Sequence, residues 1–148
     1  MQIRKMTIND YDQVYALWLN TPGMGLNTLD DSRDGIEKYL LRNPNTSFVA
    51  EKNGVIVGGI LCGHDGRRGY IHHTAVSQSE QRNGIGAALL NAAMNALEHE
   101  GITKVVLVAF AGNEKGNTFW EKRGFTTRED LVYRNKAIVE LTNIETKC

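Results

Sequence analysis

The sequence predicts one α/β domain, residues 1–148, built around a mixed sheet. Short runs rich in β-branched and aromatic residues alternate with segments whose apolar residues recur at helical spacing. The length suits a single hydrophobic core, and the sequence contains no internal repeat, low-complexity stretch or linker. We therefore expect helices and strands to share one core.

The first third of the chain is predicted to form a strand followed by two helices. Residues 2–7 have the pattern of a short opening strand. A helix is expected over about 9–20, because an Asn-Asp pair can cap its start and Pro22-Gly23 cannot continue it. A second helix is expected from about Ser32 to Arg42, and Pro44 stops it.

The middle of the chain changes from helical to strand-like spacing. Two apolar runs, 48–50 and 55–61, flank Asn53-Gly54, the dipeptide typical of a type I′ hairpin turn. A third strand is expected at 70–76. The apolar stripe from 85 to about 100 then predicts a long helix, which the following glycine ends.

The last third is predicted to add three strands and a short helix. Residues 104–110 form a nearly continuous apolar run, as expected of a strand buried on both faces. A helix is expected from Asn113 to about Lys122, followed by strands near 126–130 and 134–141. The tail after Asn143 is expected to fray.

Composition limits the partners and the compartment. Seventeen basic and seventeen acidic residues cancel, so no general field favours nucleic acid or an anionic membrane. The sequence has no apolar run of membrane-spanning length and no signal-peptide pattern. Its two cysteines form neither a metal motif nor a disulfide framework. We expect a cytoplasmic protein that needs no metal.

A glycine-bearing loop between the strand at 70–76 and the long helix is the main functional signal. Strand, glycine loop and helix together aim backbone N–H groups and a helix N-terminus at one spot, which suits a phosphate. A dinucleotide loop needs Gly or Ala where this chain has Leu89, and a triphosphate loop needs a Gly-Lys-Ser/Thr triplet that is absent. The pattern therefore indicates another pyrophosphate loop, formed by Gln81, Arg82, Asn83, Gly84, Ile85, Gly86 and Ala87.

This loop, Gln81-x-x-Gly84-x-Gly86, resembles the acetyl-coenzyme A loop of the GCN5-related N-acetyltransferase (GNAT) family. Ala75-Val76 stands five residues earlier, and Asn113-x-x-Gly116-x-x-Phe119-Trp120-x-x-x-Gly124-Phe125 resembles the family's C-terminal signature. The resemblance implies a mostly antiparallel sheet with about four helices and two strands splayed around the cofactor. It also implies transfer of acetyl from acetyl-CoA to a primary amine of a small molecule or peptide, directly in a ternary complex.

The resemblance also implies roles for the cofactor-binding residues. The pantetheine arm would pair with the strand edge at Thr74, Ala75 and Val76, and an N–H near Val76 would polarise the acetyl carbonyl. Arg82 either contacts a phosphate or lies beside it as a solvated residue. The C-terminal signature would contribute Asn113, which can also cap its helix, and, more weakly, Asn117.

Trp120 departs from the family, which has a tyrosine there that can protonate the departing thiolate. An indole N–H is too weak an acid for that role. Either Tyr133 supplies the proton or the thiolate leaves unaided, which a thiol of pKa about 8.5 permits. Trp120 itself either walls the cofactor channel or is a core aromatic residue.

His72 and His73 are the candidate bases, because imidazole titrates near neutrality. Strand alternation predicts that they point to opposite faces, and we favour His72, which shares the parity of Val76.

The acceptor pocket is expected to include Met24, Leu26, Asp30 and Asp31. The two aspartates either attract the amine or act as a helix cap. The alternative function is a non-catalytic acyl-CoA-binding or sensing domain, and a nucleic-acid-binding module has no basic–aromatic patch to support it. The sequence leaves open whether the protein forms a homodimer.

Overall fold

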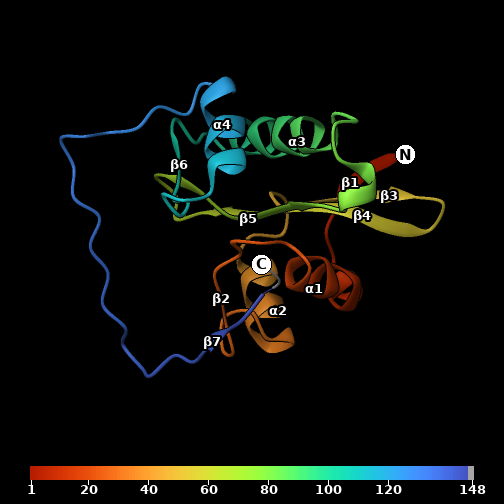
Figure 1. Cartoon of the computed structure of the whole chain (residues 1–148), viewed down its shortest axis with the longest axis horizontal. Helices are drawn as coiled ribbons and strands as arrows, with labels where there is room; N and C mark the ends of the chain where they lie inside the picture. Colours follow the sequence, from red (N-terminus) through yellow and green to blue (C-terminus); the bar gives the residue numbers. More distant parts are fainter. Residues whose placement is uncertain (147–148) are drawn as a thin grey trace.

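The computed structural model describes residues 1–146 and has a five-stranded sheet at its centre, with helices on both faces (Figure 1). The strand order is β1-β3-β4-β5-β6; β5 and β6 are parallel and the other neighbours are antiparallel. Its strands are β1 Gln2–Lys5, β3 Phe48–Lys52, β4 Val55–His64, β5 Gly69–Val76 and β6 Val105–Leu107. A separate two-stranded sheet pairs β2 Leu26–Asn27 with β7 Asn143–Ile144. This mixed sheet confirms the predicted fold class.

Two helices lie on each face of the sheet (Figure 1). One face carries α1 Tyr11–Leu19 and α2 Arg33–Arg42, and the other carries α3 Ile85–His99 and α4 Glu114–Lys122. Short 3₁₀ turns, Ile8–Asp10 and Gln78–Glu80, precede α1 and the loop before α3. Among the described residues, no helix combines the length and apolar character needed to cross a membrane.

Local sequence explains where these elements begin and end. The Ser32 hydroxyl accepts a hydrogen bond from the Gly35 N–H and so caps α2. Gly101, with φ of 77°, follows the end of α3, as a C-terminal glycine should. Asn53 and Gly54 both have positive φ, 53° and 78°, which confirms the I′ turn between β3 and β4.

The sheet separates two buried clusters, one under each pair of helices. Trp18, Val14 and Ile36 belong to the cluster under α1 and α2. Leu89 and Ala93 of α3 pack against the sheet on the opposite side, as the apolar stripe predicted.

The pairing of β4 with β5 contains a bulge. Leu61 pairs with His73 and Cys62 pairs with Ile71, so His72 is an extra residue on β5. A bulge leaves one residue unpaired and interrupts the regular alternation of side chains. Side chains of β5 therefore alternate between the two faces of the sheet up to His72, and beyond His72 the alternation is shifted by one residue.

The predicted strand at 104–110 is shorter and less buried than expected. Strand β6 covers only Val105–Leu107, and Val108 and Phe110 beyond it are 50% and 62% exposed. The expectation of burial on both faces is wrong, because β6 is the last strand of the sheet and no other strand of residues 1–146 pairs with its outer edge.

The predicted strands at 126–130 and 134–141 are also wrong. Residues 126–142 form an exposed connection from α4 to β7 with no strand partner in the described chain. Conversely, the tail does not fray directly after Asn143, because β7 pairs with β2 and the Thr28 N–H donates to the Thr142 carbonyl.

Candidate active site

The glycine loop before α3 presents a row of free backbone donors. Within residues 1–146, no N–H group from Arg82 to Ala87 donates a hydrogen bond to the protein. Arg82 and Gly84 have left-handed backbone, with φ of 69° and 77°, which lets neighbouring N–H groups converge as in anion-binding nests. The positive end of the α3 dipole lies at the same place. This arrangement is suited to a diphosphate.

The two glycines of the loop have different surroundings. A Cβ on Gly84 would meet no atom within 4 Å, so the space over the loop is open there. A Cβ on Gly86 would lie 3.1 Å from the Phe119 ring of α4. A valine at Gly86 would therefore disturb helix packing as well as the loop. Gly84 is the better position for testing the loop.

Arg123 was not identified from the sequence, yet it lies near this loop. Its guanidinium stacks over the Phe119 ring at 4.1 Å, and that ring touches the position of Gly86. A positive charge there favours phosphate groups. Phe119 and Arg123 are four residues apart, so their stacking is local, whereas the packing of α4 against α3 brings the pair to Gly86.

The C-terminal half of β5 has an open edge. Strand β6 pairs only with residues Gly69 to Ile71, so from His72 to Val76 this edge has no strand beside it in the described part of the chain. The Ser77 N–H donates to the Val57 carbonyl on β4. Because backbone groups of successive strand residues point to opposite sides, the N–H and C=O groups of Thr74 and Val76 point to the open edge. Those of Ala75 turn toward β4.

A buried hydroxyl near this edge has no partner. Thr74 Oγ1 makes no hydrogen bond among the described residues. Buried polar atoms are rarely left unsatisfied, so an orphan hydroxyl next to unpaired backbone marks a place for a polar ligand.

His72 and His73 point to the same face of the sheet, so the prediction of opposite faces is wrong. The His73 ring meets Trp18 of α1 edge-on at 4.8 Å, and the His72 ring meets Tyr39 of α2 at 5.3 Å. Both helices cover this one face (Figure 1). The bulge at His72 is the cause, because it breaks the alternation between the two residues.

The two histidines differ in what holds them. His73 Nε2 lies 2.7 Å from Asp31 Oδ1, and both side chains are nearly buried. His72 reaches solvent but is flanked by the Tyr39 and Tyr70 rings. Burial among these neighbours, and secondarily the adjacent His73, lower the pKa of His72 below its usual 6.5. His72 is therefore a neutral imidazole at neutral pH.

The acidic turn after β2 is tied together by Asn27. The Asn27 N–H donates to Asp31 Oδ2, and its side-chain Oδ1 accepts from the N–H groups of Leu29 and Asp30. Tyr11 donates its hydroxyl proton to the Asp31 carbonyl at 2.6 Å. Sequence reasoning named the aspartates but not Asn27 or Tyr11, since these contacts exist only in the folded chain.

The proposed acceptor residues divide into two groups. Asp31 is 4% exposed and paired with His73, and Leu26 is 3% exposed in the core. Asp30 is exposed, and Met24 is only partly buried against the core. The cap of α2 is Ser32, so helix capping does not account for either aspartate.

The C-terminal signature is engaged mainly in holding its own helix. Asn113 Oδ1 caps α4 by accepting from the Gly116 N–H, and Asn117 Nδ2 donates to the Phe110 carbonyl. Trp120 meets Phe119 and Phe125 edge-on at 4.9 and 5.3 Å. These contacts give Trp120 a packing role.

Tyr133 lies on the connection after α4 and is 64% exposed. Burial raises the pKa of Tyr70 on β5, with Tyr133 as a secondary cause. Within the described chain, no group of three or more His, Cys, Asp or Glu is arranged to hold a metal ion.

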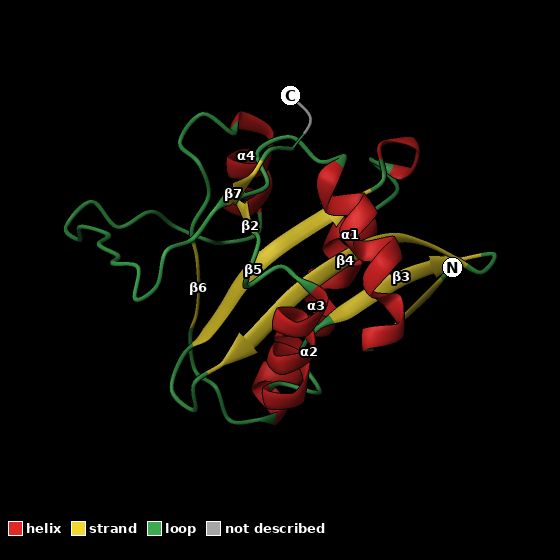
Figure 2. Cartoon of the chain, turned by 90° about the horizontal axis from the view of Figure 1, so that it is seen from below, coloured by secondary structure: helices red, strands yellow, loops and turns green. Residues whose placement is uncertain are grey.

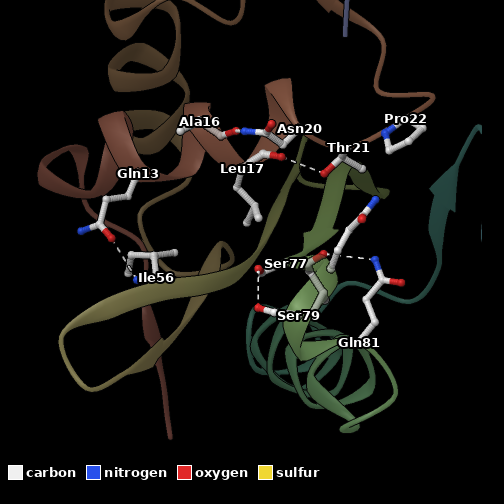
Figure 3. Close-up of a pocket in the computed structure, with 12 residues that line it drawn as sticks. Gln13, Ala16, Leu17, Asn20, Thr21, Pro22, Ile56, Ser77, Ser79 and Gln81 are labelled. Atoms are coloured by element: carbon white, nitrogen blue, oxygen red, sulfur yellow. Dashed lines mark hydrogen bonds between the residues drawn. The ribbon is translucent and has the colours of Figure 1, made fainter. Parts of the chain in front are cut away.

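A cavity of about 450 Å³ lies between α1, β4 and the end of β5 (Figure 3). It reaches Val76 and Gln81, and Gln81 Nε2 donates to the Val76 carbonyl at 3.3 Å. Its polar lining is neutral: Gln13, Asn20, Thr21, Ser77, Gln78, Ser79 and Gln81. The lining includes Val76 and Gln81 but neither His72 nor His73. The cavity therefore lies beside the open edge of β5 and the glycine loop, not beside the acidic turn.

Comparison with known proteins agrees with this geometry. The profile of the Acetyltransferase (GNAT) family matches residues 11–125. An acetyltransferase of Photorhabdus laumondii is 30% identical over 146 residues, covering 95% of this chain and 98% of that protein.

Two solved structures share the fold. The PaiA N-acetyltransferase of Thermoplasma acidophilum, in complex with coenzyme A, has a TM-score of 0.75 at 17% identity, covering 86% of this chain and 91% of that chain. The aminoglycoside N-acetyltransferase AAC(6')-Iy, bound to a CoA-containing bisubstrate analogue, has a TM-score of 0.72 at 18% identity, covering 92% and 97%. These matches confirm the family and the acyltransferase class that the glycine loop and C-terminal signature imply: the chain belongs to the acetyltransferase (GNAT) family.

Proposed function

We propose that this protein transfers acetyl from acetyl-CoA to a primary amine of a small molecule or peptide, directly in a ternary complex. The observation that carries the proposal is the run of six free N–H groups from Arg82 to Ala87, adjacent to the open edge of β5. One element thus offers a phosphate site and an edge that an extended chain can join.

The residues present fit acetyl-CoA. The free loop donors suit its diphosphate, and the orphan Thr74 hydroxyl and the unpaired N–H of Val76 suit the polar groups of its pantetheine arm. The cofactor supplies an acetyl thioester. The Val76 N–H is positioned to donate to a carbonyl on the open edge, and Arg82 and Arg123 add positive charge beside the loop.

We assign the proton acceptor to His72. An alkylammonium of pKa about 10 is mostly protonated at neutral pH, so a neutral base within reach is needed to accept the proton that the ammonium loses before its nitrogen attacks the thioester. The lowered pKa of His72 keeps its ring neutral, and its partial exposure allows a water to link it to the amine. His73 is the second candidate, because Asp31 orients its ring from Nε2.

The acceptor amine is proposed to enter from the α1–α2 face. Both histidines lie there, and the acidic turn that carries the exposed Asp30 reaches them through the Asp31–His73 pair. The partly exposed Met24 packs against the core cluster of the same face. Asp30 can attract a cationic acceptor, whereas Asp31 is already paired with His73. Tyr133 is the candidate acid; otherwise the thiolate leaves unprotonated. We place the reaction in the cytoplasm, in keeping with the buried, free Cys62.

A steady-state assay of thiol release tests the function. The protein is incubated with acetyl-CoA and a panel of diamines, aminoglycosides and peptides with a free amino group. Direct transfer predicts release that depends on the amine, an acetylated product by mass spectrometry, and intersecting double-reciprocal plots. Tight acetyl-CoA binding without turnover on any amine would favour the sensing domain instead.

A further inference from the structure

The cavity of about 450 Å³ between α1, β4 and the end of β5 lies next to Val76, the proposed donor to the thioester carbonyl. Figure 2 shows α1 lying over the sheet where β5 ends. Ala16 and Leu17 of α1 line the cavity together with Val76. Its volume falls within the usual range for small-molecule sites, roughly 300–1,000 Å³. A molecule seated there lies beside the open edge of β5.

The lining of this cavity is polar but carries no charge. None of the described residues around it is an Asp, Glu, Lys, Arg or His, and the polar ones are amides and hydroxyls. Glu80, next to the lining residues in sequence, is already paired with Lys52 at 3.1 Å. A charged group that entered the cavity would lose water without meeting a counter-ion, which is unfavourable.

Three amides of the lining use only one of their two ends. Gln13 Oε1 accepts from a backbone N–H of β4, and Asn20 Nδ2 donates to a carbonyl of α1. Gln81 Nε2 donates to the Val76 carbonyl (Figure 3). Within residues 1–146 the other ends, Gln13 Nε2, Asn20 Oδ1 and Gln81 Oε1, have no hydrogen-bond partner. The lining thus offers both a donor and acceptors, which match an amide or hydroxyl group of a ligand.

We propose that this cavity holds the body of the acceptor, and that the acceptor is an amide- or hydroxyl-bearing primary amine whose single charge is the reacting ammonium. Polyamines and amino acids bring a second charge that the lining cannot pair. The acidic turn lies outside the cavity, so Asp30 can attract the ammonium from solution but cannot neutralise a charge inside. This inference rests on the proposed acetyl transfer and adds the class of acceptor.

Three acceptors that share one carbon chain test the proposal. 5-Aminopentanamide ends in a neutral amide, 1,5-diaminopentane in a second ammonium and 5-aminopentanoate in a carboxylate. Each is assayed with the full chain as a substrate and, where it is not acetylated, as a competitive inhibitor of transfer to an accepted amine. We expect the amide to surpass the other two at least about tenfold in kcat/KM, or in inhibition constant.

Ala16→Glu tests whether the body of the acceptor lies in the cavity. Ala16 is exposed on α1 and glutamate is a good helix former, so the fold should persist. The new carboxylate supplies the missing counter-charge, and we expect it to raise the preference for the diamine over the amide at least about tenfold. A ratio measured at one acetyl-CoA concentration cancels any change in cofactor affinity. Asn91→Glu is the control and should keep the wild-type ratio, because Asn91 is exposed on α3, over the other face of the sheet.

The outcomes separate this inference from the proposed function. A wild-type protein that prefers the diamine or the aminopentanoate, or that does not distinguish the three, would overturn the inference and leave acetyl transfer standing. An unchanged ratio in Ala16→Glu would place the body of the acceptor outside the cavity. Thiol release that depends on no amine at all would overturn the proposed function, and this inference with it.

Discussion

His72 and His73 share one face of the sheet, but their surroundings suit different tasks. His72 is flanked by aromatic rings and reaches solvent, whereas His73 is paired with a buried carboxylate. A base must be unprotonated to work, and a lowered pKa keeps His72 unprotonated to below pH 6.5. Activity should therefore persist on acidification until the pH falls through that lowered pKa.

His72→Gln is expected to lower kcat/KM by about 10²-fold or more and to remove the acidic limb of its pH profile, with acetyl-CoA affinity unchanged. Steady-state rates between pH 5 and 9 measure this effect. His99→Gln, an exposed histidine at the end of α3, should behave as the wild type. An unaltered profile in His72→Gln would move the base to His73 or to water.

His73 is expected to matter for stability because its loss leaves the Asp31 carboxylate buried without its partner. His73→Ala should lower the free energy of unfolding by about 1–3 kcal/mol in urea titration. Adding Asp31→Asn should recover part of that loss, since the uncompensated charge is then gone. If the loss of stability in the double variant equals the sum of the losses in the two single variants, the pair contributes no coupling energy.

The histidines also show where reading the sequence reaches its limit. Regular alternation places neighbouring strand residues on opposite faces, and the prediction for His72 and His73 rested on it. The shift in pairing between Leu61 and Cys62 of β4 cancels the alternation at His72. A bulge is a property of two paired strands, so one strand's sequence did not reveal it.

Among helices, strands and turns, the elements whose ends are set by nearby residues were predicted well from the sequence. Helices α2 and α4 begin at the capping residues Ser32 and Asn113, and the Asn53-Gly54 turn has the expected backbone. The segment 126–141 has strand-like composition but no strand, because a strand exists only when another strand pairs with it. The pairing of β7 with β2, between distant parts of the chain, was missed for the same reason.

That β2–β7 pairing supports the acidic turn through Asn27, whose side chain makes three hydrogen bonds within it. Asn27→Ala should loosen the turn, raise KM for the amine several-fold and leave the Kd of acetyl-CoA unchanged. Kinetics and calorimetry separate these effects. Asn45→Ala removes one exposed contact with Lys5 on another part of the surface and serves as the control. A change in acetyl-CoA affinity alone would contradict this role.

Across the whole molecule, the site combines parts that the sequence keeps far apart. The glycine loop and the open edge of β5 are neighbours in sequence, which is why the sequence alone groups the candidate cofactor residues. Asp31 comes from the turn before α2, and Arg123 comes from the end of α4. Packing of α1 and α2 on one face and α4 on the other brings these residues to β5 and α3.

Calorimetric titration of acetyl-CoA tests the central claim, that the free N–H groups before α3 bind the diphosphate. Gly84 and Gly101 stand at opposite ends of α3, both with φ of 77° and with open space where a Cβ would go. An aspartate costs similar backbone strain at either position, but only Gly84→Asp places a negative charge among the loop donors. We predict that Gly84→Asp weakens acetyl-CoA binding at least about 10-fold, in line with repulsion between like charges, and that Gly101→Asp binds as the wild type does. Equal affinity in a folded Gly84→Asp protein would contradict the account.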